Sequence, residues 1–151
     1  MENQRLTRHF NLYDFLASET ALRAGLVNQP HGDDVCHNLR LVALHLLEPV
    51  LEKFDTRPQI TSGYRCPALN ELVGGAGTSQ HMSGQAVDFQ LPGLPLLEVA
   101  QWMSNALTYD QLLLEQARGE VWIHASYVEG DNRQQVKWFD GARWQEGLPS
   151  S

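Results

Sequence analysis

The chain has 151 residues and a formal net charge of −7 at pH 7. This length is near the common size of one domain and is long enough to bury a real core. The eleven Lys and Arg residues are scattered along the chain, which argues against clustered phosphate binding and so against a general affinity for nucleic acid. The sequence has no apolar run of the roughly 18 residues that span a bilayer, and no segment with the pattern of an export signal.

The first half of the chain is predicted to be mainly helical. A short helix, capped by Asn11 or Asp14, is expected near the start of the chain. The longest helix candidate is residues 35–54, where apolar residues recur at helical spacing. Pro49 is expected to kink or divide this helix near its end. Residues 58–62 are typical of a strand. Residues 68–73 are expected to form a further helical stretch.

The second half is predicted to contain most of the strands. Residues 86–91 alternate enough to form a strand, and residues 94–107 are typical of an amphipathic helix. Two strands, residues 111–115 and 121–127, are expected to be joined by a turn. Residues 135–144 then suggest a terminal hairpin around an Asp-Gly pair.

These elements indicate an α+β class with a small antiparallel sheet and flanking helices. The sequence has no linker, repeat or low-complexity segment, so residues 1–151 are expected to form a single domain. Residues 147–151 are expected to be a loose tail.

Two histidines and an aspartate suggest a zinc site. His81 and Asp88 are seven residues apart in SQHMSGQAVDFQ, and His124 follows in EVWIHASY. Three nitrogen and oxygen ligands leave a fourth position for water, as in catalytic zinc sites, although such ligands also accept other divalent ions. A lone histidine is more often a packed or surface residue than a ligand. The glycines around His81, including Gly74 and Gly84, favour a tightly folded site loop instead.

These motifs carry a family resemblance. The segments are TSGYRCPALN at residues 61–70, the glycine pair at 74–75, the stretch from Ser79 to Asp88, and Trp122 to His124. In this order and spacing they resemble the zinc D-alanyl-D-alanine carboxypeptidase family, small murein peptidases of the Hedgehog/DD-peptidase fold that include phage endolysins. The similarity runs roughly from Leu6 to Tyr127.

The resemblance implies roles for five residues. His81, Asp88 and His124 match the family's zinc ligands. Arg65 matches an arginine that can hold the substrate carboxylate, a task suited to a planar guanidinium. Ser79 lies where relatives often have a small polar residue that can touch the substrate backbone.

The general base departs from the family pattern. Many relatives place Glu or Asp three residues before the last histidine ligand, where this chain has Val121. The nearest acids, Glu115 and Glu120, are both candidates for the proton transfer that a carboxylate performs beside zinc. Glu115 is favoured because it ends an apolar run, where burial would raise its pKa. Glu120 follows Arg118 and Gly119 and is more typical of a solvated turn.

The resemblance therefore predicts a zinc metallopeptidase that cleaves peptidoglycan stem peptides. It would act as a D-alanyl-D-alanine carboxypeptidase or as an endopeptidase, for example on an L-alanyl-D-glutamate bond, and could be a phage or prophage lysis enzyme. A non-catalytic peptidoglycan-binding or phage structural module is the alternative: the complete ligand set argues against it and the unmatched base position argues for it.

The remaining expectations concern the setting of the enzyme. Without an export signal, access to the cell wall would need a separate pore or a precursor segment. The protein is expected to be a monomer. Cys36 and Cys66 are too few for a disulfide framework, and whether they pair depends on a distance that the sequence does not give.

Overall fold

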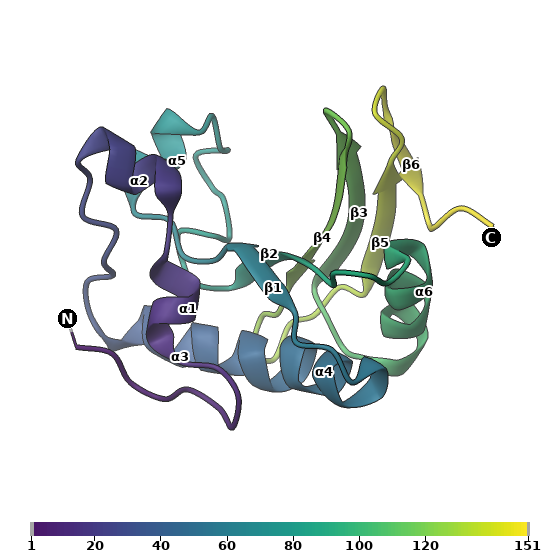
Figure 1. The fold of residues 1–151 in the computed structure, drawn as a ribbon, viewed down its shortest axis with the longest axis horizontal. Helices are drawn as coiled ribbons and strands as arrows, with labels where there is room; N and C mark the ends of the chain where they lie inside the picture. The colour runs from purple at the N-terminus through teal and green to yellow at the C-terminus, as the bar shows by residue number, and fades with distance from the viewer. Residues whose placement is uncertain (1, 151) are drawn as a thin grey trace.

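The structure is a computed structural model that describes residues 2–150. It combines several helices with one six-stranded sheet in the order β1-β2-β4-β3-β5-β6, which confirms the predicted α+β class (Figure 1). The strands are β1 (Gln59–Ser62), β2 (Ala86–Gln90), β3 (Gln111–Ala117), β4 (Glu120–Ser126), β5 (Gln135–Phe139) and β6 (Trp144–Glu146). The helices are α1 (Leu12–Leu16), α2 (Glu19–Ala24), α3 (Asp33–Val42), the π-helical segment η1 (Ala43–Leu47), α4 (Glu48–Phe54), α5 (Pro67–Leu72) and α6 (Leu96–Ala106).

The long helix is continuous from Asp33 to Phe54, and Figure 1 shows it as a rod along one side of the molecule. Between α3 and α4 the backbone takes the wider π form of η1, which ends two residues before Pro49. Proline lacks an N–H, and its ring clashes with the carbonyl four residues earlier. The helix therefore widens just before Pro49. Of the two outcomes expected there, a kink or a division, the division does not occur.

Four of the five strand pairs are antiparallel, and the β3–β5 pair is parallel. Residues 127–134 cross the start of β3, so that Gln135 lies beside Gln111. The connection from β3 to β5 includes all of β4, which makes it long enough for a parallel crossover. The sheet is thus mixed, and its single parallel pair depends on a loop that carries no strand pattern.

The two faces of the sheet differ in burial. Along β3, Leu112 and Leu114 are buried, whereas the alternate residues point to the other face and are partly exposed. The buried face joins one apolar cluster with α6 and the long helix. Burial of such side chains stabilises each by about 1.5–3 kcal/mol. The core thereby fixes which residues of β2, β3 and β4 face the opposite side, where the candidate site lies.

The end of the chain is more ordered than the predicted loose tail. The amide of Gly147 donates to the carbonyl of Val136 at 2.9 Å, Leu148 packs against the core, and the carbonyl of Pro149 accepts from Gln101. The prediction is wrong for these residues, and Ser151 lies outside the described part of the chain. Both cysteines are free. In residues 2–150, no helix is long and apolar enough to cross a membrane.

Candidate metal centre

Strand pairing brings the central side chains to one face of the sheet. Asp88 of β2 lies directly opposite His124 of β4, which in turn lies opposite Leu113 of β3. Directly opposed residues project to the same face. Glu115 and Trp122 form the next pair on that face. The face opposite the core therefore carries two of the three predicted ligands and one candidate base.

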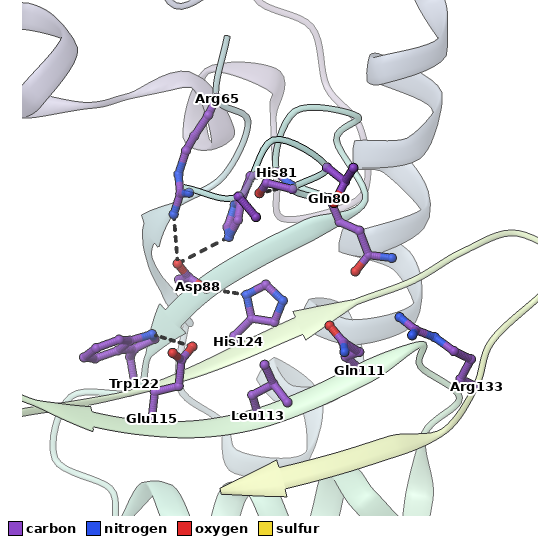
Figure 2. A pocket seen from close by; sticks show the side chains of 13 residues that line it. Arg65, Gln80, His81, Asp88, Gln111, Leu113, Glu115, Trp122, His124 and Arg133 are labelled. Atoms are coloured by element: carbon purple, nitrogen blue, oxygen red, sulfur yellow. Dashed lines mark hydrogen bonds and ion pairs between the residues drawn. The ribbon is translucent and has the colours of Figure 1, made fainter. Parts of the chain in front are cut away.

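His81 reaches this face from the loop before β2, and its ring orientation is fixed by hydrogen bonding. Its side chain is buried, and Nδ1 lies 2.7 Å from the carbonyl oxygen of Gly63. Because a carbonyl oxygen only accepts, Nδ1 must carry the proton, which leaves the lone pair of the neutral ring on Nε2. Metal-ligating histidines normally donate their other ring N–H to an acceptor in this way. The lone pair of Nε2 points at Asp88, with 3.4 Å between Nε2 and Oδ2 (Figure 2).

The loop that carries His81 is held close to the long helix. Gly84 has φ +76°, and a Cβ there would lie 2.7 Å from the carbonyl oxygen of Val35. Glycine is therefore required both by the conformation and by the close approach. The amide of Arg65 also donates to the carbonyl of His81 at 3.1 Å. These contacts fix the position of the histidine before any ligand binds.

The three predicted ligands form a group that could hold a metal ion. One ligand atom from each of His81, Asp88 and His124 lies within 4.8 Å of the others. Ligands about 2.0 Å from a tetrahedral zinc ion lie about 3.3 Å apart. His81 Nε2 is 3.4 Å from Asp88 Oδ2, close to this spacing, whereas His124 Nδ1 is 2.8 Å from the other carboxylate oxygen, Oδ1, at hydrogen-bond distance. The donor set of two imidazoles and one carboxylate therefore fits zinc.

The carboxyl group of Asp88 is kept ionised in this site. Burial opposes its ionisation, but the hydrogen bond from His124 and the neighbouring imidazole of His81 outweigh burial and hold its pKa below the usual range. An ionised carboxylate is the form that binds a metal ion. The charge on Asp88 thus suits it to the ligand role that the sequence indicates.

Arg65 lies over the same carboxylate. Its Nη2 is 3.6 Å from Asp88 Oδ2, while Nε donates to Ser62 and Nη1 to Asn70. The guanidinium is thereby fixed at the wall of a pocket of about 540 Å³ that His81, Asp88 and His124 also line. A fixed guanidinium beside a metal site can bind a substrate carboxylate.

The two candidate bases lie in different surroundings. Glu115 lines the pocket, and its Oε2 accepts a hydrogen bond from Trp122 Nε1 at 3.1 Å. Burial, and then the charge of Asp88, raise the pKa of Glu115, as expected of a poised general base. Glu120 is exposed at the start of β4, in the hairpin with Arg118, and does not line the pocket. Glu115 is therefore the candidate that can reach a bound substrate.

Of the other residues that line the pocket, Ser79 was predicted from the sequence and several were not. Ser79 lines the pocket, and its Oγ accepts from the amide of His81 at 3.2 Å. Arg133, Gln80 and Gln111 also line it and were not predicted to do so. Gln80 is adjacent to a predicted ligand and could have been considered. Arg133 could not, because its position depends on the crossover to β5.

The arrangement defines the class of site: three converging ligands beside the half-buried carboxylate of Glu115, open to a pocket, as in catalytic metal centres. The family model described as Peptidase M15 matches residues 8–126, so the chain belongs to this family of zinc D-alanyl-D-alanine carboxypeptidases. Membership implies hydrolase activity on peptidoglycan peptides. No curated relative matches the chain. The match ends at the last residue of β4, so it includes His81, Asp88 and His124 but neither Arg133 nor β5 and β6.

Proposed function

We propose that the protein is a zinc metallopeptidase that cleaves peptidoglycan stem peptides, as a D-alanyl-D-alanine carboxypeptidase or an endopeptidase, with His81, Asp88 and His124 as ligands. The observation that carries the proposal is the direction of His81. Its Nδ1 is bound to a carbonyl oxygen, which directs the lone pair of Nε2 toward the same point as Asp88 and His124. A histidine that served only for packing would not need this direction.

Arg65 binds the substrate and Glu115 transfers the proton. When bound, zinc supplies a Lewis acid and lowers the pKa of a water molecule to about 7. Arg65 binds a carboxylate of the peptide and so places the scissile bond over the pocket. Glu115 takes a proton from the attacking water and passes it to the nitrogen that leaves. Its raised pKa suits both halves of this transfer.

The position of Glu115 also bears on the alternative of a non-catalytic binding module. That alternative rested on the missing acid at Val121, three residues before His124. Val121 belongs to the opposite face of β4 from His124, whereas Glu115 on the neighbouring strand shares the site face. Glu115 of β3 can therefore act as the base in place of a residue at position 121, which favours an enzyme over a non-catalytic binding module.

The test is digestion of isolated murein, with the released products identified by mass spectrometry. The zinc-loaded wild type should release free D-alanine if the cut is terminal, or peptides if the cut is internal. His81→Ala should release none. His37→Ala is the matched control, since His37 is an exposed histidine outside the pocket, and it should keep full activity. Zinc-loaded wild type that leaves murein intact contradicts the proposal and favours the binding module.

A further inference from the structure

A buried carboxylate next to the pocket organises one of its walls. Asp110, just before β3, is 2% exposed. Its Oδ1 accepts from the amide and Nε of Arg133 at 3.1 and 2.8 Å, and its Oδ2 accepts from Nη2 at 2.7 Å. Gln80 donates to the same carboxylate at 2.8 Å. This forked pairing fixes the guanidinium plane of Arg133.

The fixed guanidinium is still able to bind a ligand. Nε and Nη2 of Arg133 are used by Asp110, and within residues 2–150 Nη1 has no hydrogen-bond partner. The side chain is 56% exposed and lines the pocket. Figure 2 shows it across the site from Arg65, with the side chains of Asp88 and His124 between the two. The pocket of an acidic protein thus has a guanidinium on each side.

The spacing of the two aspartates that pair with these arginines can be worked out from the sheet. Asp88 and Leu113 are at the same level two strands apart, and Asp110 precedes Leu113 by three residues. With about 4.8 Å between strands and about 3.3 Å per residue, the Cα atoms of Asp88 and Asp110 are about 14 Å apart. An extended peptide covers this distance in about four residues. Arg65 and Arg133, which pair with these two aspartates, therefore bracket a short peptide.

We infer that Arg133 is a specificity-determining residue that binds a second carboxylate of the substrate, three or four residues from the carboxylate that Arg65 binds. The inference rests on the proposed function, because it takes the peptide to lie over the metal ligands. It extends the site beyond the residues that the family match includes. The substrate class is then a peptide with two carboxylates, and Asp110 acts as a positioning residue through Arg133.

The test compares binding of three N-acetylated tetrapeptides to the zinc-loaded protein by calorimetry. The first has glutamate at its first position and a free C-terminal carboxylate, and each of the others has one of these groups converted to an amide. All titrations use protein that also carries Glu115→Gln, which keeps the peptide intact. Arg133→Gln is compared with Arg143→Gln, a control at an exposed arginine of the terminal hairpin that does not line the pocket.

The expected result is a loss that depends on Arg133. A hydrogen bond to a charged group contributes about 1.5–3 kcal/mol. Amidation of the carboxylate that Arg133 binds should therefore weaken binding of the peptide at least ~10-fold. With Arg133→Gln the same amidation should change binding less than about twofold, and with Arg143→Gln the full loss should remain. If Arg133 has only a structural role, amidation will weaken peptide binding to Arg133→Gln as much as to the protein that keeps Arg133, and the inference is overturned. Failure of the peptide with both carboxylates to bind also overturns it.

Murein digestion by the same proteins without the Glu115 change separates this inference from the proposed function. Cleavage by the wild type without an Arg133-dependent amidation effect refutes the second anchor and leaves the peptidase standing. An Arg133-dependent effect in a protein that cuts nothing supports the anchor and refutes the peptidase. If Arg133→Gln fails to fold, Arg133→Lys retains the charge but loses the fork, and it should weaken binding of the dicarboxylate while keeping part of the amidation penalty.

Discussion

Replacing Asp110 by asparagine should destabilise the protein in a way that depends on pH. Hydrogen bonds from Arg133, which outweigh the effect of burial, lower the pKa of Asp110 from 3.8 to about 2. Each unit of pKa corresponds to about 1.4 kcal/mol, so the ionised carboxylate contributes about 2 kcal/mol to the free energy of unfolding at neutral pH. An asparagine side chain would lack the charge and would direct an amide donor at Arg133 or Gln80, which are donors themselves.

The sign of the pH dependence follows from the lowered pKa. The stability from Asp110 is fully present above its unfolded value near 3.9 and is lost as pH falls through about 2 in the folded protein. Urea denaturation of the metal-free protein should therefore give a difference between wild type and Asp110→Asn of about 2 kcal/mol at pH 7 and about half of it at pH 3. An equal difference at both pH values would refute the assigned role of the charge.

Further predictions concern the site itself. Glu115→Gln should lower kcat for murein peptides by about 10²–10⁴ while zinc per chain is unchanged, and an unaltered kcat in steady-state assays would exclude Glu115 as the base. Burial raises the pKa of Glu115, so the ionised form of this residue destabilises the fold. Glu115→Gln should therefore raise the Tm of the metal-free protein at pH 7 and not at pH 4. Equal changes in Tm at the two pH values, measured by calorimetry, would speak against this effect of burial. Gly63→Ala would place a Cβ 2.5 Å from the carbonyl oxygen of Phe15, so it should lower the free energy of unfolding in urea by about 1–3 kcal/mol. It should also weaken zinc binding, because the carbonyl of Gly63 orients His81. Gly77→Ala, which meets nothing within 4 Å, is its control, and equal stability of the two variants would contradict the packing argument.

Much of the fold could be predicted because local pattern and tertiary packing agree. The apolar spacing that predicted a helix over residues 35–54 is the spacing that buries its core face. The apolar run at residues 112–114 likewise predicted a strand, and because side chains alternate between the two faces of a strand, Glu115 faces the site. Where a side chain's direction follows from periodicity, one sequence is sufficient.

The parts that could not be predicted depend on contacts between distant residues. The parallel β3–β5 pair needs the crossover of residues 127–134, and Arg133 reaches the pocket only because of it. The order of the chain end comes from Gly147 and Leu148 packing onto β5 and the core. At Pro49, where a kink or a division was expected, the helix widens and stays continuous, because it is held on both sides of the proline by burial. Periodicity carries no information on such pairings.

Zinc binding at neutral pH, measured by calorimetry together with elemental analysis of the purified protein, decides whether His81, Asp88 and His124 form a metal centre. We expect one zinc ion per chain in the wild type, in Glu115→Gln and in the control His37→Ala, and none in His81→Ala. Wild-type protein that binds no zinc, or His81→Ala protein that binds it as tightly as wild type, would contradict the assignment of His81, Asp88 and His124 as the metal centre.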